Sequence, residues 1–268
     1  MAIIMDGKVH AKAIRERLAE EILESKDTKS PRLAIIANAE DSASITYVKN
    51  KKKDCTEVGI ACEIFYPSAN ELVESIIFAN LYYDAVICQL PMVDGVDVQK
   101  TLKRINKHKD VDGLNSDEFD ACTPMGIMEL LALYDIDVSG KHCVIVGRSD
   151  IVGKPLAKMM LNADATVTVC HSKTKNLSEI TKMADILVVA VGKEKFVNGD
   201  MVKDGVVVVD VGINRDENGK LCGDVDFDNV VDKASYITPV PGGIGPMTRA
   251  MLLKNVVKAW KNHLTNEI

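Results

Sequence analysis

Short apolar runs alternate along the chain with longer segments in which apolar residues recur every three or four positions. The short runs are rich in β-branched residues and lack strict alternation, which is typical of parallel strands covered on both faces. They lie at 32–38, 61–66, 84–91, 142–148, 166–172, 185–192, 205–212 and 235–241. The longer segments predict amphipathic helices at 9–25, 70–80, 96–106 and 247–264. This alternation of strands and helices predicts an α/β fold.

Polar and turn residues interrupt the pattern at "DGLNSDEFDACTPMG", just before a helix expected near Pro124. Three expected strands precede this interruption and five follow it. We therefore predict two domains. The first comprises residues 1–121 together with a returning C-terminal helix at 247–268, and the second, of the nucleotide-binding type, comprises residues 122–246.

One expected helix, "ITYVKNKKKDC" and the residues after it, is rich in lysine. Its buried stripe is predicted at Ile45, Val48, Cys55 and Val58, and its end at Gly59.

Tyr47 and Lys51 are i and i+4 neighbours at one margin of that stripe. The Lys51 ammonium should therefore lie beside an aromatic ring at the edge of a core, where burial and nearby positive charge favour the neutral amine that a proton shuttle needs. Lys49 and Lys53 should point to water. Lys52 should be about as buried as Lys51 but has no aromatic neighbour. The alternative for the whole segment is a solvated helix face.

Composition narrows the class of protein. With 268 residues, 47% of them hydrophobic, the chain can bury a large core, and a formal charge of −6 disfavours nucleic acid and anionic membranes as partners. The start "MAIIM" is too short for a signal segment, and no apolar run reaches the roughly 18 residues of a membrane span. Seven cysteines without a CxxC pair favour a reducing cytoplasm, and five histidines without zinc spacing argue against a metal.

The segment "CVIVGRSDIVGKPLAKMM" has the order strand, turn and helix. Gly147 and Gly153 lie in the turn, but Ser149 occupies the place of the second glycine of GxGxxG. Backbone N–H groups at such a helix N-terminus hold a pyrophosphate. A turn whose glycines serve packing alone is the alternative.

The next expected strand ends in "VCHSKTK", where enzymes that use NAD carry a carboxylate for the ribose. Ser172, Lys173 and Arg148 could instead meet a 2′-phosphate, which favours NADP over NAD, unless this is a basic surface loop. "AVG" at 190–192 and "DVGIN" at 210–214 end later strands, either at a ligand or as simple turns.

Eight motifs occur in order: "YVKNKKKDCTEVGI", "QLP", "KDVDG", "CTPMGI", "VIVGRSDIVGKP", "VTVCHSKT", "VDVGIN" and "YITPVPGGIGPMT". The last is a rigid turn with three glycines and three prolines, in which we expect Val240–Pro241 to be cis. Over nearly the whole chain these motifs resemble the bifunctional methylenetetrahydrofolate dehydrogenase/cyclohydrolase family.

The resemblance implies NADP-dependent oxidation of 5,10-methylenetetrahydrofolate to the methenyl form and its hydrolysis to 10-formyltetrahydrofolate. It also implies a folate-binding catalytic domain and a Rossmann-like NADP-binding domain facing each other over a cleft, and a homodimer. The catalytic residues it implies are Lys51, Tyr47, Gln89 and Asp112. The substrate-binding residues it implies are these four with Leu90, Pro241, Gly242, Gly243 and Gly245. The cofactor-binding residues it implies are Gly147, Arg148, Ser149, Ile151, Ser172, Gly192, Ile213 and Thr248.

Physical chemistry agrees with these roles. Hydride transfer needs alignment above all, whereas hydrolysis needs a group that removes and returns protons, as Lys51 could. Gln89 could hold the Lys51 amine and the attacking water, Asp112 could accept bonds from the pterin, and Tyr47 could cover the aromatic part of folate.

The chain departs from the family in "LNSDEFDA", a shorter connector before "CTP" than members usually have, which affects the wall beside Asp112. Three alternatives remain: a monofunctional NAD-dependent dehydrogenase, a regulatory protein that binds the cofactor without turnover, and an enzyme resembling shikimate dehydrogenase. The residue set of Tyr47, Lys51, Gln89 and Asp112 argues against the first two, and the "PGGIGP" turn argues against the third.

Overall fold

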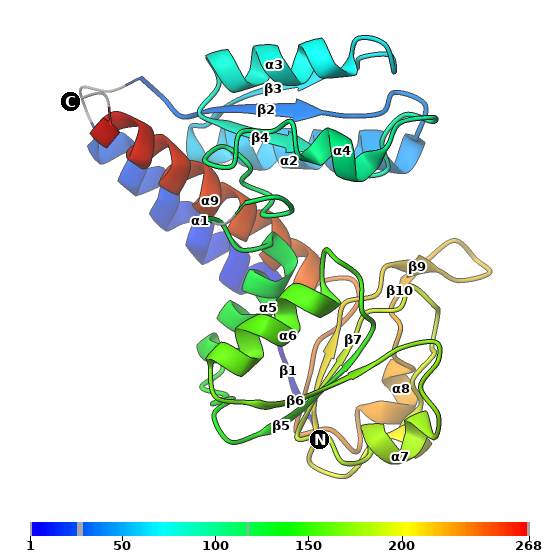
Figure 1. The fold of residues 1–268 in the computed structure, drawn as a ribbon. Helices are drawn as coiled ribbons and strands as arrows, with labels where there is room; N and C mark the ends of the chain where they lie inside the picture. Colours follow the sequence, from blue (N-terminus) through cyan, green and yellow to red (C-terminus); the bar gives the residue numbers. More distant parts are fainter. Residues whose placement is uncertain (1, 26–28, 117, 267–268) are drawn as a thin grey trace. The chain divides into compact units, whose positions relative to one another are not determined.

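The structure is a computed structural model that describes residues 2–25, 29–116 and 118–266. Two compact α/β units make up the chain (Figure 1). We call Met1–Ala11 with Thr123–Thr248 the six-stranded unit, and Lys12–Cys122 with Arg249–Ile268 the three-stranded unit. The predicted α/β class is thus confirmed.

The six-stranded unit is built on a parallel sheet whose central strands are almost wholly buried. Such burial explains the continuous apolar runs in its sequence. The strand order is β1 (Ile3–Ile4), β11 (Tyr236–Ile237), β8 (Val207–Asp210), β7 (Ile186–Val189), β5 (His142–Val146) and β6 (Thr166–Cys170). The helical segments are α5 (Cys122–Leu133), α6 (Gly153–Asn162), α7 (Leu177–Thr181), the 3-10 turn η1 (Gly199–Met201) and α8 (Phe227–Val230), and a small hairpin joins β9 (Asn214–Arg215) to β10 (Leu221–Cys222).

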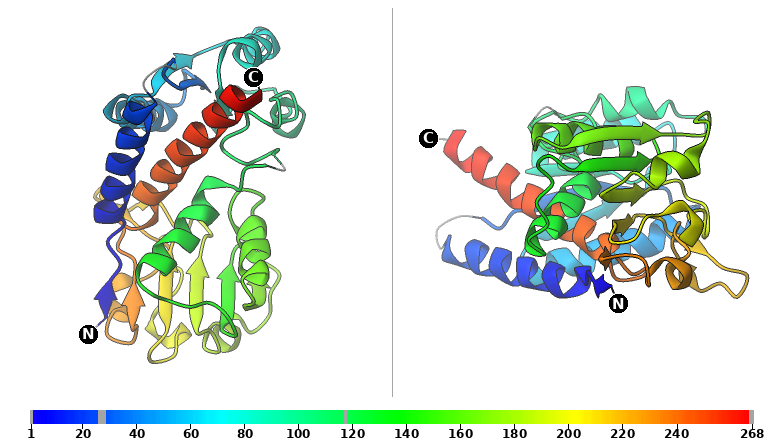
Figure 2. Two further views of the ribbon diagram at one scale, coloured as in Figure 1. Left: turned by 90° about the vertical axis from the view of Figure 1, so that its left-hand side faces the viewer. Right: turned by 90° about the horizontal axis from the view of Figure 1, so that it is seen from below.

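The three-stranded unit has a parallel sheet in the order β3 (Ala61–Phe65), β2 (Arg32–Ile36) and β4 (Ala85–Cys88). Helix α2 (Ser42–Val58) covers one face and α3 (Leu72–Tyr82) covers the other (Figure 1). Helices α1 (Gly7–Glu24) and α9 (Ile244–Asn266) run side by side in Figure 1 and in the left view of Figure 2, and Lys261 of α9 bonds to Glu21 of α1.

All eight predicted strands are present, but three details differ from the predictions. The helix expected at 96–106 is the short α4 (Val98–Leu102), which begins after Asp97, whose carboxylate accepts a bond from the backbone N–H of Lys100. Strand β1 was not predicted because two residues carry no readable pattern. It pairs with β11, and residues 2–11 group with the six-stranded unit, whereas the sequence pattern had placed them in the first domain.

Two peptide bonds are cis: Val240–Pro241, which confirms the prediction, and Leu90–Pro91, which was not predicted. Over the described ranges, no helix combines the length and the apolar character needed to cross a bilayer.

Candidate active site

Helix α2 supplies the lysine-bearing part of the site. It begins after Asp41, whose carboxylate accepts the N–H of Ser44 at 2.5 Å, and ends at Gly59, whose φ of 87° suits glycine. Its predicted stripe is buried at Val48, Cys55 and Val58 and half-buried at Ile45. The stripe holds α2 against the sheet and so orients the residues along its margin.

Lys51 is only 5% exposed, and its Nζ lies 5.1 Å from the centre of the Tyr47 ring. No hydrogen bond or ion pair joins this ammonium to another described residue. Lys49 and Lys53 are exposed, as predicted. Lys52 is exposed too, so the expectation that it would match Lys51 in burial was wrong, because its flexible stem carries the charge out to water. Within the lysine cluster, burial therefore singles out Lys51.

Asp112 lies close to both Tyr47 and the buried thiol of Cys122. Burial, followed by the negative charge of Asp112, raises the pKa of Tyr47 to about 12, so this side chain stays a neutral phenol. Burial also raises the pKa of the Cys122 thiol, on which the charges of Asp112 and Lys51 act in opposite directions. The structure thus brings Tyr47, Lys51 and Asp112 together around Cys122.

Gln89 follows β4 and carries an unsatisfied acceptor. Its Nε2 donates to the carbonyl of Leu90 at 2.8 Å, while its buried Oε1 has no partner among the described residues. No described hydrogen bond joins Gln89 to Lys51. A buried acceptor without a partner is costly, so it is suited to a bound ligand or water.

An ion pair that the sequence did not reveal lies one helical turn beyond Lys51. Asp54 is 6% exposed, and its Oδ2 lies 3.0 Å from Nη1 of Arg249 in α9. Burial raises the pKa of Asp54, and Arg249 opposes that rise. Both charges also act on Tyr47, so the pair borders the site.

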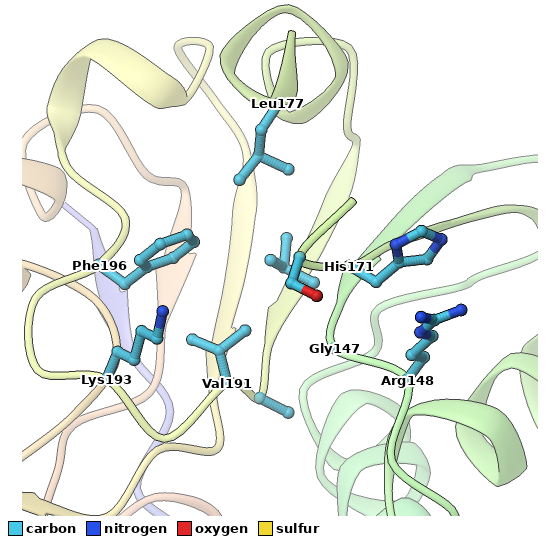
Figure 3. Close-up of a pocket in the computed structure, with 10 residues that line it drawn as sticks. Gly147, Arg148, His171, Leu177, Val191, Lys193 and Phe196 are labelled. Carbon is cyan, nitrogen blue, oxygen red and sulfur yellow. The ribbon is translucent and has the colours of Figure 1, made fainter. Parts of the chain in front are cut away.

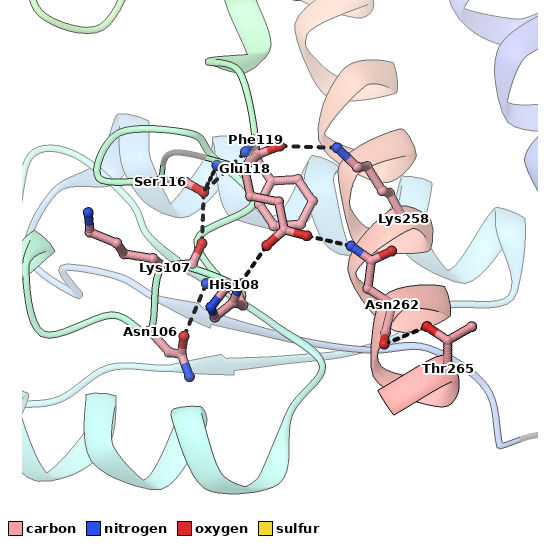
Figure 4. A network of polar contacts seen from close by, with 9 residues as sticks. All are labelled: Asn106, Lys107, His108, Ser116, Glu118, Phe119, Lys258, Asn262 and Thr265. Atoms are coloured by element: carbon pink, nitrogen blue, oxygen red, sulfur yellow. Dashed lines mark hydrogen bonds and ion pairs between the residues drawn. The ribbon is translucent and has the colours of Figure 1, made fainter. Parts of the chain in front are cut away.

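Helix α9 anchors the short connector that follows Asp112 (Figure 4). Glu118 accepts a bond from Asn262 at 2.6 Å and lies 2.6 Å from Nδ1 of His108, while Lys258 donates to the backbone carbonyl of Glu118 at 3.0 Å. These contacts tie the connector to α9 at Glu118.

The six-stranded unit contains a cavity of about 280 Å³ at the carboxyl ends of β5 and β7. Its lining residues are Val146, Gly147, Arg148, His171, Ser172, Leu177, Ala190, Val191, Lys193 and Phe196. Figure 3 shows Lys193 and Phe196 on one side of this cavity and His171 and Arg148 on the other. Its apolar walls with cations at the margin suit a nucleotide.

The turn after β5 requires its glycines. A Cβ on Gly147, whose φ is 128°, would lie 2.2 Å from the carbonyl oxygen of Ala190, and a Cβ on Gly153 would lie 2.2 Å from that of Gly147. Ser149 Oγ accepts the N–H of Val152 at 3.2 Å and so organises the start of α6.

The predicted cofactor residues all belong to the six-stranded unit, and three of them, Gly147, Arg148 and Ser172, line the cavity. The others lie elsewhere in this unit: Ser149 and the 43% exposed Ile151 in the turn before α6, Gly192 after β7, the 62% exposed Ile213 after β8, and Thr248, which bonds to Thr123 at 3.1 Å. The other seven lining residues were not among the predicted cofactor residues, namely Val146, His171, Leu177, Ala190, Val191, Lys193 and Phe196. For Val191 and Phe196, the apolar positions of "VGKEKFV" after the strand were the available signal.

The predicted glycine-rich turn also belongs to the six-stranded unit. Pro241, Gly242 and Gly243 lie between β11 and α9, where Gly242 O accepts the N–H of Lys8 at 3.1 Å. A Cβ on Gly245 would meet no atom within 4 Å. The turn therefore packs against the start of α1 and leaves open space at Gly245.

A parallel sheet with a nucleotide-type cavity, joined in one chain to a unit with a buried, unpaired lysine, defines a two-domain α/β enzyme of the dehydrogenase class. Models of two domains from one family match most of the chain. Residues 5–112 match the catalytic domain of tetrahydrofolate dehydrogenase/cyclohydrolase, and residues 121–264 match the NAD(P)-binding domain of the same enzymes. The chain belongs to the tetrahydrofolate dehydrogenase/cyclohydrolase family, as its motifs predicted.

Individual relatives agree. The bifunctional protein FolD of Lachnoclostridium phytofermentans is 50% identical over 274 residues, which cover 96% of this chain and 97% of that protein. The crystal structure of the bifunctional enzyme FolD from Campylobacter jejuni has a TM-score of 0.94 at 46% identity and covers 98% of this chain and 100% of that one. The Trypanosoma brucei enzyme, crystallised with NADP cofactor and an inhibitor, has a TM-score of 0.93 at 34% identity, with 98% of each chain covered.

Proposed function

We propose that this chain oxidises 5,10-methylenetetrahydrofolate with NADP and hydrolyses the methenyl product to 10-formyltetrahydrofolate. The observation that carries the proposal is the buried Lys51 ammonium, which has no described partner and lies beside Tyr47. Family membership and the bifunctional relatives support both activities and give no support to the monofunctional NAD-dependent alternative.

Hydrolysis is the step that needs Lys51. Water adds to the cationic methenyl carbon and must lose a proton, and the departing ring nitrogen must gain one. Lys51 in its neutral amine form would take the first proton and return it to the nitrogen, and the remaining hydroxyl proton would leave to solvent as the C–N bond breaks and the formyl C=O forms. The free Oε1 of Gln89 can accept a hydrogen bond from the ammonium or the water.

Tyr47 and Asp112 would bind the folate. The neutral phenol ring of Tyr47 offers a flat apolar face for the aminobenzoyl ring, and the Asp112 carboxylate offers two acceptors for the amino-pyrimidine edge of the pterin. Leu90 is half-buried beside Gln89, which supports a role in lining this site. We assign the turn at Pro241, Gly242, Gly243 and Gly245 to substrate binding because family membership implies it, and the open space at Gly245 is consistent with a ligand there.

The residues of the cavity fit NADP. Gly147 lets the turn after β5 pass close to the backbone of Ala190 at the cavity wall, and Arg148, Ser172 and Lys193 supply donors for phosphates. None of the lining residues is an aspartate or glutamate. This suits a 2′-phosphate, which a carboxylate at the ribose would repel. Bound NADP supplies the hydride acceptor, and these side chains hold and orient it.

We also propose that the chain forms a homodimer through α3. This helix exposes a row of large apolar side chains between 39% and 69%, namely Val73, Ile77, Phe78, Leu81 and Tyr82, and the neighbouring strand β3 is an edge of its sheet. Monomeric proteins rarely expose such patches. Ile77→Asp combined with Leu81→Lys should convert dimer to monomer in light scattering, whereas Leu161→Lys, at another exposed leucine, should not.

The cytoplasmic location stays a prediction.

A single assay tests the proposed function. The purified chain is given 5,10-methylenetetrahydrofolate with NADP or with NAD, and the absorbance of the methenyl form is followed. We expect it to appear faster with NADP and then to decay by hydrolysis. A methenyl product that accumulates without enzymatic decay would contradict the second activity.

A further inference from the structure

We propose that Asp224 is a positioning residue for the NADP site, holding the loops after β7 and β8 in the shape that binds the nucleotide. The inference rests on the proposed function and adds a residue to it.

The carboxylate of Asp224 is fully buried and accepts four hydrogen bonds. Its Oδ2 accepts the backbone N–H groups of Val191 at 2.6 Å and Gly192 at 3.0 Å. Its Oδ1 accepts the N–H of Lys193 at 2.8 Å and the side-chain Nδ2 of Asn214 at 2.8 Å. One carboxylate thus holds three consecutive residues of one loop and a side chain of another.

Both loops belong to the proposed cofactor site. Val191 and Lys193 line the cavity, and Gly192 between them is a predicted cofactor residue. Asn214 directly follows Ile213, the predicted cofactor residue after β8. Because the N–H groups of the first loop point inward to Asp224, its side chains and carbonyl oxygens are left for the ligand.

A second buried carboxylate fixes Asp224 in turn. Asp210 accepts the N–H groups of Asp224, Gly212 and Val225, each at 2.9 Å. Burial raises the pKa of the Asp210 carboxyl to about 6, although the three N–H groups that bond to it act to lower that pKa.

Glycines make room for both acids. A Cβ on Gly212 would lie 2.3 Å from Asp224 Oδ1, and a Cβ on Gly223 would lie 1.8 Å from Asp210 Oδ2. Burying a carboxylate is unfavourable unless hydrogen bonds compensate. Here all four bonds accepted by the Asp224 carboxylate come from the two loops of the proposed cofactor site, which indicates that loop shape is what the buried charge maintains.

The test is Asp224→Asn. It replaces one carboxylate oxygen with an NH2 group, which cannot accept the N–H groups that face it and so breaks bonds to the loop after β7. Calorimetric titration should show the dissociation constants for NADP and NAD rising by a similar factor, about tenfold or more. An equal loss of affinity for NADP and NAD indicates altered loop shape, whereas a loss of 2′-phosphate recognition would weaken NADP alone. Hydrolysis of supplied 5,10-methenyltetrahydrofolate without nucleotide needs no such loop and should continue. Asp228→Asn, at an exposed acid nearby, is the matched control and should leave both constants unchanged.

Unchanged dissociation constants in a folded Asp224→Asn protein would overturn the proposal, and so would a loss confined to NADP. If this variant does not fold, Asn214→Ala decides, because it removes only one of the four donors. We expect it to weaken both cofactors in the same proportion, about threefold, and no weakening would again overturn the proposal. A wild-type chain that bound neither cofactor would refute the proposed function itself, which is a separate outcome.

Discussion

The three-stranded unit and the six-stranded unit prepare their sites by different means. In the first, two of the proposed catalytic side chains, Tyr47 and Lys51, lie on one helix and meet at i and i+4 spacing. In the second, loop backbone forms much of the site and is shaped by glycines and by the buried acids Asp210 and Asp224. Substitutions should therefore separate the two activities, since each site depends on contacts within its own unit.

Lys51→Met should have the largest effect. It removes the proton-transferring group, so hydrolysis of 5,10-methenyltetrahydrofolate should slow by about 10²- to 10⁴-fold, while calorimetry should show NADP affinity within about twofold of wild type. Lys52→Met, at the exposed neighbouring lysine, is the control and should hydrolyse normally. Hydrolysis by Lys51→Met at the wild-type rate would remove Lys51 from its role.

Gly147→Ala should strongly destabilise the six-stranded unit. The added Cβ would lie 2.2 Å from the carbonyl oxygen of Ala190, at a φ of 128°. We expect a loss of about 3 kcal/mol or more in unfolding free energy. Gly192→Ala is the control: its φ is 65° but nothing lies within 4 Å, so about 1 kcal/mol should be lost. Equal thermal shifts in the two variants would mean that the close approach at Gly147 is unimportant.

Arg148→Ala and Ser172→Ala should weaken NADP binding much more than NAD binding. A lost charge-assisted hydrogen bond to a 2′-phosphate is worth about 1.5–3 kcal/mol, or roughly ten- to a hundredfold in affinity. Titration of each variant with both cofactors measures the ratio, and Lys175→Ala, at an exposed lysine outside the cavity, is the control. Equal losses for both cofactors would refute the 2′-phosphate assignment.

Asp110 should give the smallest effect, a pH dependence of stability. Burial raises the pKa of Asp110 to about 6, although the N–H of Asn115 opposes the rise. The folded chain therefore binds this proton more tightly than the unfolded chain, whose aspartate pKa is about 3.9, so stability falls as pH rises from about 4 to 6.

Asp110→Asn should remove that fall. Its melting temperature relative to wild type should be higher at pH 7 than at pH 4.5, by an amount equivalent to no more than about 2 kcal/mol. A difference in melting temperature that does not change with pH would show that Asp110 does not titrate in this range.

The sequence predicted the long apolar strands and the position of Lys51 at the edge of a core because each depends on local pattern. Periodicity revealed the stripe at Val48, Cys55 and Val58, and with it the margin on which Tyr47 and Lys51 lie. It misjudged Lys52, because a long side chain can reach water from a flank position. Two-residue strands such as β1 left no pattern to read.

What the sequence did not predict depends on contacts between distant residues. Asp224 meets Val191 and Lys193 only after the chain has passed through β8 and a hairpin, and Asp54 meets Arg249 from the other end of the chain. His171 and Phe196 line the cavity because of loop paths that no spacing rule describes. The glycines at 212 and 223 were visible, but their purpose depends on the acids beside them.

The central claim is that folate chemistry takes place at Lys51, and the most direct measurement is a crystal structure with NADP and a non-hydrolysable folate analogue. We predict that the analogue's aromatic ring lies against Tyr47, with its bridge nitrogens within about 3–4 Å of Lys51 Nζ and its pterin bonded to Asp112. An analogue bound away from Tyr47 and Lys51 would contradict the account.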